Sequence, residues 1–284
     1  MTVARVLHGK GAAMTIGRKR GRGLAALLGM ALLAACTTPA SRPALPAPPV
    51  HPHGQVLWHI LHDKCVPDQQ RNGRPDPCAE VNLSEGVARG YVLLKDLRGV
   101  AQYLLMPTRR ITGMEDPALL EPDAVDYFTP AWTARTLVDA KLGQRLPRED
   151  VSVAVNSLYG RSQDQLHLHV DCIRPDVRDA LKRELPRITR RWSRKPLSLA
   201  GYRYYAVRLD GKNRPSADPF KLLAKGMKVA PADMGAWTLV LTGVHFANGA
   251  PGFVLLAARA DPARKRYGSG EELQDHACAV AQAK

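Results

Sequence analysis

The sequence predicts an α+β fold in which helices pack on an antiparallel sheet. Two stretches, 91–106 and 237–259, each contain a pair of short apolar segments separated by a turn, the pattern of a β-hairpin. Helical patterns at 130–142 and 175–185 lie between the two hairpins. Because hydrophobic residues make up 45% of the chain, it has enough apolar surface to build a core, and we do not expect a disordered protein.

The first elements follow in order from residue 55. A helix over 55–64 has its apolar residues at helical spacing. His59 and Asp63 lie four residues apart on its other side, where ordinary polar surface explains them better than a metal chelate. In the first hairpin, 91–95 pairs with 102–106 across a turn at 96–99.

The later elements are predicted from caps and turns. The helix over 130–142 is expected to begin after Thr129 as its N-cap and to end at Gly143, ahead of a strand at 151–156. The helix over 175–185 is charged and amphipathic. The second hairpin turns at Asn248-Gly249, a pair that favours tight turns.

The N-terminus has the pattern of a bacterial lipoprotein signal peptide. Basic residues at 18–22 precede an apolar run over 24–35, which is too short to span a bilayer. The sequence Leu33-Ala34-Ala35-Cys36 is typical of the site where such a leader is cleaved and the cysteine lipidated. We therefore expect a leader over 1–35 and a lipid anchor on Cys36. This predicts localisation at the periplasmic side of the cell membrane, with inner and outer membrane both open.

Charge and composition indicate which classes of molecule the mature protein binds. Residues 36–54 are rich in proline and predict a semi-rigid tether, with His51 and His53 solvated. The net charge is +15, and the leader holds only six of the basic residues, so the mature protein stays basic. A basic protein at a membrane favours anionic lipid headgroups or phosphorylated substrates. Because exported proteins rarely meet nucleic acid, we expect no nucleic-acid partner.

Four cysteines remain after Cys36, an even number for an oxidising compartment, and they predict two disulfides with three possible pairings. We favour Cys65–Cys78, which closes a short loop rich in proline, asparagine and glycine, and Cys172–Cys278, which ties the C-terminus to the centre of the chain. A zinc site is the alternative, but the sequence has no CxxC pair. We therefore expect no metal.

The segment 165–172 carries the chemistry. Its residues alternate strictly between polar and apolar, so a strand would place His167, His169 and Asp171 on one face, together with Gln165, and the apolar side chains in the core. A solvated polar face is the simple alternative. The preceding residues favour a functional site instead. Asn156 lies seven residues before Gln163, and Gln163 lies four residues before His167.

These residues resemble the histidine triad superfamily. In that superfamily an asparagine, a glutamine seven residues later and an H-φ-H-φ-H strand four residues after the glutamine build a phosphate site. Asn156, Gln163, His167 and His169 match this order without gaps, and Asp171 stands at the third histidine position. The resemblance implies a histidine-triad-like (HIT-like) antiparallel sheet. We expect the C-terminal half, which lacks its own pair of histidines, to complete a pseudo-dimeric sheet.

The chain is also similar to the CDP-diacylglycerol pyrophosphatase family, a branch of that superfamily. The segments that carry this similarity are 57–67, 77–81, 103–108, 167–177 and 271–278. The resemblance implies a membrane-tethered hydrolase that cleaves CDP-diacylglycerol to CMP and phosphatidate through a cytidylyl-histidine, without a metal or other cofactor. A nucleotidyltransferase with an acceptor other than water and a non-catalytic lipid-binding envelope lipoprotein are the alternatives.

The resemblance also implies residue roles. His169 becomes the nucleophile, and Asp171 would orient an imidazole. The expected phosphate contacts are His167, Asn156, Gln163, Lys95 and Arg174. On this basis 55–200 form the HIT-like catalytic region and 201–284 a C-terminal α+β region packed on it. Monomer and homodimer both stay open.

Overall fold

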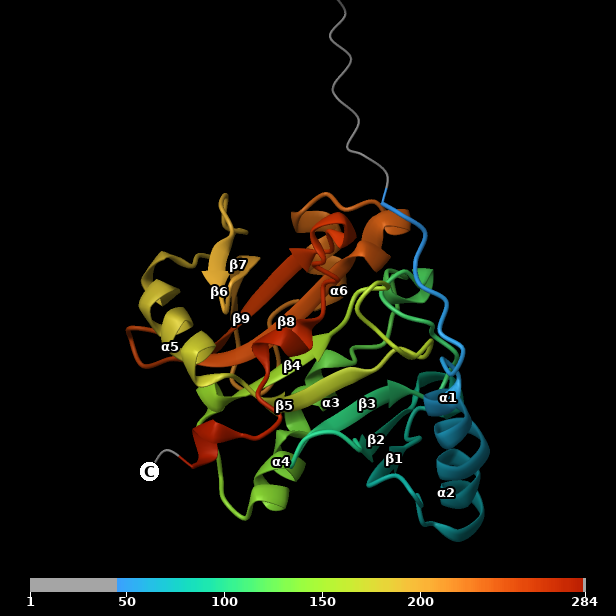
Figure 1. Cartoon of the computed structure of the whole chain (residues 1–284). Coiled ribbons are helices and arrows are strands. Elements are labelled where there is room, and N and C mark those ends of the chain that lie inside the picture. Colours follow the sequence, from blue (N-terminus) through green and yellow to red (C-terminus); the bar gives the residue numbers. More distant parts are fainter. Residues whose placement is uncertain (1–44, 283–284) are drawn as a thin grey trace, which may run out of the picture. The chain divides into compact units, whose positions relative to one another are not determined.

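The structure is a computed structural model that describes residues 45–282, and it is built on a nine-stranded antiparallel sheet (Figure 1). The predicted leader, Cys36 and the first part of the predicted tether lie outside the described residues. The strands lie in the order β1-β2-β3-β5-β4-β8-β9-β7-β6. Their bounds are β1 Glu80–Asn82, β2 Tyr91–Lys95, β3 Tyr103–Pro107, β4 Val151–Val155, β5 Leu168–Cys172, β6 Leu197–Leu199, β7 Tyr202–Asp210, β8 Trp237–His245 and β9 Pro251–Arg259.

The sheet consists of two halves with the same strand order. From the outside inwards, β2-β3-β5-β4 of the first half corresponds to β6-β7-β9-β8 of the second, and β1 is an additional edge strand of the first half. The halves meet where β4 pairs with β8, with Ser152 opposite Thr242 and Val155 opposite Leu239. The C-terminal strands therefore extend the sheet of the first half, and the α+β fold that the sequence predicts is confirmed.

Helices cover both faces of this sheet (Figure 1). On one face, α3 (Phe128–Thr133), α4 (Arg135–Leu142) and α6 (Pro219–Gly226) pack on the largest apolar cluster. On the other face, α1 (Val56–Ile60), a π-helical stretch at Leu61–Cys65 and α2 (Val66–Asn72) cover β2 and β3. There α5 (Pro175–Glu184) covers the strands of the second half. The helices predicted over 55–64 and 175–185 are found, although the first is longer than its pattern indicates.

Local chemistry explains where the helical prediction fails. The helix predicted over 130–142 is two helices, α3 and α4, with Ala134 between them. Thr129 is not the N-cap, because α3 starts at Phe128 and the Asp126 carboxylate accepts hydrogen bonds from the backbone N and side-chain Oγ1 of Thr129. The predicted end is correct, since Gly143 adopts a left-handed φ of 67° that glycine tolerates without strain.

Both favoured disulfides, Cys65–Cys78 and Cys172–Cys278, are present. The first joins the helical segment α1–α2 to the chain just before β1, and its sulfurs lie in an apolar cluster with Val92 and Met106. The second joins the end of β5 to the C-terminal segment. That segment consequently lies across the sheet, beside the strand that carries the histidines.

Residues 45–54, which the sequence assigns to the tether, lie against the folded region. The Tyr159 hydroxyl donates to the carbonyl of Pro46 at 2.7 Å, and Nδ1 of His51 lies 3.3 Å from an Asp164 oxygen. The expectation that His51 is solvated is therefore wrong, because its side chain is only 12% exposed, whereas His53 is exposed as expected. Within the described part of the chain, no helix has the length and hydropathy needed to cross a bilayer.

The two halves treat one face of the sheet differently. In the first half this face holds His169 and Asp171 of β5, together with the preceding His167. In the second half the corresponding strand β9 presents Val254 and Leu256, which lie in an apolar cluster beneath α5. Polar groups that can do chemistry are therefore gathered on the first half.

Candidate active site

The strand that carries the histidines alternates as the sequence predicts. Leu168, Val170 and Cys172 lie in the main apolar cluster, and His169 and Asp171 face the other way. His167, His169 and Asp171 are nevertheless all buried, since none is more than 7% exposed. A solvated polar face is thereby excluded for this strand.

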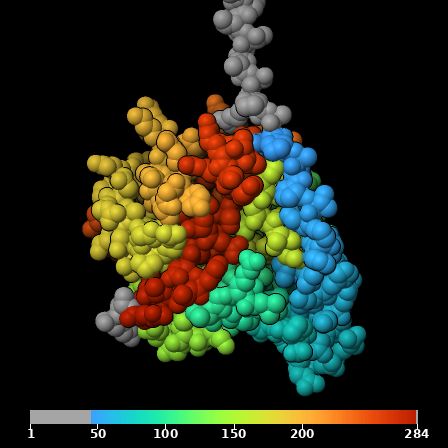
Figure 2. All heavy atoms as spheres, viewed as in Figure 1, coloured from blue at the N-terminus to red at the C-terminus, as the bar shows by residue number. Residues whose placement is uncertain are grey.

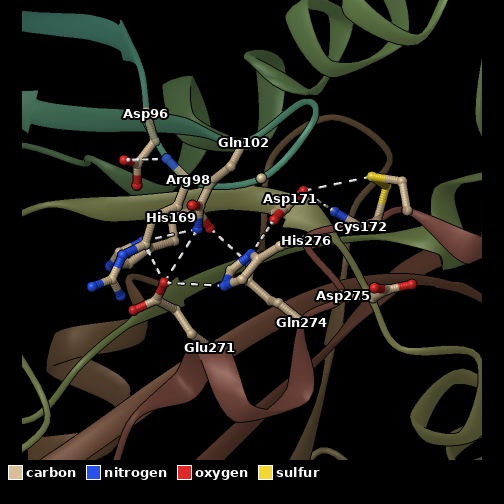
Figure 3. Close-up of polar contacts among 12 residues, drawn as sticks. Asp96, Arg98, Gln102, His169, Asp171, Cys172, Glu271, Gln274, Asp275 and His276 are labelled. Carbon is tan, nitrogen blue, oxygen red and sulfur yellow. Dashed lines mark hydrogen bonds and ion pairs between the residues drawn. A yellow bond between two sulfur atoms is a disulfide. The ribbon is translucent and has the colours of Figure 1, made fainter.

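His169 contacts a buried carboxylate. Its Nδ1 lies 3.3 Å from Oε2 of Glu271 and 3.1 Å from the side-chain nitrogen of Gln102 (Figure 3). Its Nε2 lies 3.4 Å from the side-chain nitrogen of Asn156. We assign the proton to Nδ1 because Glu271 can only accept; the Gln102 nitrogen then donates to Glu271 rather than to Nδ1. Nε2 keeps the lone pair, toward which the Asn156 nitrogen donates. Burial lowers the pKa of His169 to about 3, although Glu271 opposes the effect. The ring is therefore neutral near pH 7, with a nucleophilic nitrogen at Nε2.

Glu271 is the centre of the polar network. Besides His169, its carboxylate accepts from Nδ2 of Asn156 at 2.7 Å and from Nε2 of Gln102 at 3.3 Å. Burial is the largest influence on the pKa of Glu271 and would raise it, but the neighbouring imidazoles and these two amides together lower it. Glu271 is thus held as a carboxylate although it is largely buried.

Asp171 orients an imidazole from outside its own strand. Its Oδ2 accepts from Nδ1 of His276 at 2.7 Å, and Nε2 of His276 lies 3.6 Å from Oε2 of Glu271 (Figure 3). The hydrogen bond to Asp171 raises the pKa of His276, against partial burial. The third triad position therefore acts on His169 only indirectly, through His276 and Glu271.

Asn156 fixes the segment that supplies Glu271. Its Oδ1 accepts from the backbone nitrogen of Gly270 at 2.8 Å and from the Ser269 hydroxyl at 3.2 Å. Gly270 lies so close to the sheet that a Cβ would come within 2.9 to 3.0 Å of Val240 and Ala154. The side-chain amide of Asn156, which the sequence predicts as a phosphate contact, is thus engaged within the protein and holds the segment that carries Glu271.

His167 differs from His169 in its hydrogen bond. Its Nδ1 lies 2.6 Å from the carbonyl oxygen of Gln165, which can only accept, so Nδ1 carries the proton. Burial lowers the pKa of His167, and the ring is neutral with a lone pair at Nε2. The sequence predicts His167 as a phosphate contact; in this tautomer its Nε2 can accept a hydrogen bond. The two rings pack edge to face, with centroids 4.7 Å apart.

A cavity of about 520 Å³ opens beside these groups. Its polar lining includes His167, His169, Asn156 and Glu271, and its apolar lining comes mainly from α1 and from β2 and β3. Lys95 at the end of β2 also lines it, as do Asp96, Leu97 and Arg98 of the loop that follows. Such a site, apolar on one side with a few convergent polar groups, is typical of a pocket for an amphiphilic ligand.

Of the other predicted phosphate contacts, two line the cavity and one does not. Lys95 lines the cavity, and its Nζ donates to the carbonyls of Asp96 and Gly99. Gln163 lines the cavity too, but its side-chain amide bonds to the backbone of His53 and Leu57. Arg174 is not brought to the cavity: it pairs with Asp176 at the start of α5.

Two features of the site were not assigned a role from the sequence. Glu271 and His276 lie in a segment that the family resemblance includes, yet their distance from β5 along the chain hid their function. Arg98, in the turn of the first hairpin, lines the cavity and adds a positive charge there. The positive charge of Arg98 is one of the smaller influences that lower the pKa of His169, after burial and the imidazole neighbours.

Metal-binding residue types cluster at one place in the described residues. Asp171, Cys172 and Cys278 come within 4.8 Å of one another, but the two sulfurs form a disulfide and cannot bind a metal as thiolates.

Comparison with known families gives one match that covers most of the chain. Residues 52–282 match the model of a family described as CDP-diacylglycerol pyrophosphatase. The matched region includes the whole nine-stranded sheet, both disulfides and each residue of the network around His169.

Proposed function

The chain belongs to the CDP-diacylglycerol pyrophosphatase family and is thus a hydrolase of CDP-diacylglycerol, and we propose that it acts through a covalent bond to His169. The products would be CMP and phosphatidate. The observation that carries the proposal is the pairing of a buried, neutral His169 with the Glu271 carboxylate at the wall of an open cavity.

In the first step, Nε2 of His169 attacks the phosphorus of the cytidylyl group. A nitrogen–phosphorus bond forms as the bond to the bridging oxygen breaks, and phosphatidate leaves with the electron pair. The imidazole then holds a proton on Nδ1 and a phosphoryl group on Nε2, so it becomes positively charged. Glu271, 3.3 Å from Nδ1, stabilises that charge as it develops.

In the second step, water displaces the histidine from phosphorus. The attacking water must lose a proton, and Nε2 of His167 is a neutral acceptor because its Nδ1 proton is held by the Gln165 carbonyl. The nitrogen–phosphorus bond breaks, CMP is released, and His169 returns to its neutral form. We therefore assign His167 to the hydrolytic step.

Negative charge on the diphosphate needs positive partners. Lys95 and Arg98 both line the cavity, as does His169. We propose that they bind the phosphate oxygens, Arg98 in place of the predicted Arg174. Arginine and lysine clamps of this kind stabilise the transition state of phosphoryl transfer.

The duplicated strand order supports a relationship to the histidine triad superfamily. Two halves of identical order, joined at β4 and β8, are what fusion of two HIT-like subunits would give. The apolar residues on β9 would then mark the half that has lost its histidines.

The test uses purified protein and CDP-diacylglycerol labelled at the cytidylyl phosphorus. We expect CMP release and, after acid-free quenching, label on the protein. Adding an alcohol acceptor distinguishes a hydrolase from a transferase, because a transferase would form the corresponding ester. Turnover without any labelled protein under single-turnover conditions contradicts the covalent route.

We also propose that Cys36 carries a lipid that holds the enzyme at the periplasmic side of the membrane. A substrate with two acyl chains stays in the bilayer, so a tethered enzyme meets it at a high effective concentration. Cys36→Ser should prevent lipid attachment, which mass spectrometry of the processed protein detects. An unchanged mass and unchanged membrane partition contradict the proposal.

A further inference from the structure

The mouth of the active-site cavity is unusually apolar for an exposed surface. Six large apolar side chains are exposed in the described part of the chain; two of them, Leu97 and Val56, line the cavity, and a third, Val100, lies close to Leu97 in sequence. Leu97 is fully exposed, at 103% of its reference area, and lines the cavity together with Val56. Val100 lies in the same loop as Leu97. Single exposed apolar residues need no explanation, but a group around one opening does.

The loop that presents Leu97 is held firmly. Lys95 donates from Nζ to the carbonyls of Asp96 and Gly99, and the backbone nitrogen of Val100 donates to the carbonyl of His276 at 2.9 Å. In Figure 2 this teal-green loop lies at the surface between the red C-terminal segment and the blue helix α1. These hydrogen bonds hold the loop that exposes Leu97 in one conformation.

We propose that Leu97, Val100 and Val56 form a membrane-docking rim that seats the cavity mouth on a lipid bilayer. The inference rests on the proposed function, because CDP-diacylglycerol keeps its acyl chains in the bilayer while its diphosphate lies at the interface. His169 lies in the cavity wall, so the lipid headgroup reaches it only if the mouth faces the membrane. Arg98, beside Leu97, places a positive charge at the same opening, where the substrate's diphosphate would enter.

The interior of the mouth continues this apolar character. Leu57 and Ile60 of α1 line the cavity together with Leu94 and Leu104 of the sheet. A glycerol backbone with the first methylenes of its acyl chains fits such a wall, whereas the nucleotide end meets the polar groups. The rim therefore selects a lipid that is still embedded over a soluble nucleotide.

The first measurement compares two substrates. Long-chain CDP-diacylglycerol is presented in vesicles of phosphatidylethanolamine and phosphatidylglycerol, and a four-carbon-chain analogue is presented in solution. Moving one leucine out of an apolar phase changes an equilibrium by about 10- to 100-fold. Leu97→Asp should therefore lower the ratio of vesicle to soluble activity about 10-fold or more. Val87→Asp, at an exposed valine away from the cavity, is the matched control and should change neither activity.

The second measurement does not depend on hydrolysis. Full-length protein carrying Cys36→Ser and either Leu97→Cys or Val87→Cys is labelled with a polarity-sensitive fluorophore and mixed with the same vesicles. Emission should shift to the blue at position 97 and not at position 87.

The outcomes separate the two proposals. Equal shifts at both positions, no shift at 97, or a ratio as unaffected in Leu97→Asp as in Val87→Asp overturns the docking rim. A blue shift confined to 97, in a protein that hydrolyses neither substrate, supports the rim and instead contradicts the proposed function.

Discussion

Oδ2 of Asp171 accepts a hydrogen bond from Nδ1 of His276 at 2.7 Å, although 105 residues separate them in the sequence. This contact begins a chain of alternating acidic and imidazole groups: Asp171, His276, Glu271 and His169. Its first and last members lie on β5, and its middle two come from the C-terminal segment. The C-terminal segment thus completes a site that the histidine strand only begins.

Replacing Glu271 tests whether the carboxylate acts on His169. Glu271→Gln keeps the size of the side chain but removes the charge that stabilises the phosphorylated imidazole. We expect kcat to fall about 100- to 1,000-fold, the usual cost of losing one stabilising group at a transition state.

The neighbouring glutamate is the matched control. Glu272 accepts from the Tyr204 hydroxyl at 2.7 Å, and burial raises its pKa to about 7. Glu272→Gln should leave kcat within about two-fold, because neutral glutamine resembles the half-protonated acid. Equal losses of kcat in the two variants would mean that Glu271 matters only for packing of the segment.

The sequence predicted what depends on local patterns. The alternation of 165–172 placed Leu168 and Val170 in the core correctly, because a strand repeats every two residues. The hairpin bounds and the Gly143 helix end were likewise predictable from turn and cap chemistry. Both disulfides were found because their number and position leave few pairings.

The long-range part of the site could not be predicted in the same way. Glu271 lies in a short 3₁₀ turn, Gly270–Leu273, and His276 just beyond it, where no periodicity signals burial. Strand β7 was missed because Arg203 and Arg208 interrupt its apolar pattern, although it is nine residues long. The roles of Gln102 and Arg98 depend on what the fold places opposite them, which spacing along the chain does not reveal.

The His276–Asp171 pair should make stability depend on pH. The pKa of His276 is raised in the folded protein above its unfolded value, which is about 6.5 for histidine. The stabilisation is therefore fully present below about pH 6.5 and is lost as the pH rises through the folded pKa. The difference in Tm between wild type and His276→Gln should be larger at pH 6 than at pH 9. His245→Gln, at an exposed imidazole paired with Glu149, serves as the control. A difference that grows towards pH 9 would contradict this sign.

The two disulfides should differ in their effect on catalysis. Cys172–Cys278 closes a loop of 106 residues, for which loop entropy gives roughly 4.7 kcal/mol of stabilisation. Cys65–Cys78 closes a loop of 13 residues, for which it gives roughly 3 kcal/mol. Replacing either pair by serine should lower Tm. Only Cys172→Ser with Cys278→Ser should also lower kcat markedly, because it frees the segment that holds Glu271 and His276.

The measurement for this comparison is kcat at a temperature where circular dichroism shows both double variants folded. The Cys65→Ser, Cys78→Ser variant should then retain nearly full kcat. Equal kcat in the two double variants would show that the C-terminal segment stays in place without its disulfide.

The final prediction separates the roles of the two histidines. His169→Ala removes the nucleophile, so both turnover and the labelled protein adduct should disappear. His167→Ala keeps the nucleophile and removes the base for hydrolysis, which typically contributes 100- to 10,000-fold. Turnover should then fall by that factor. The adduct should persist longer than in wild type, because its hydrolysis becomes slower while its formation does not. Rapid-quench labelling measures both quantities in one experiment. The reverse pattern, with the adduct lost in His167→Ala and kept in His169→Ala, would move the nucleophile by two residues. The Gln165 carbonyl, 2.6 Å from Nδ1 of His167, would then be the group that orients it.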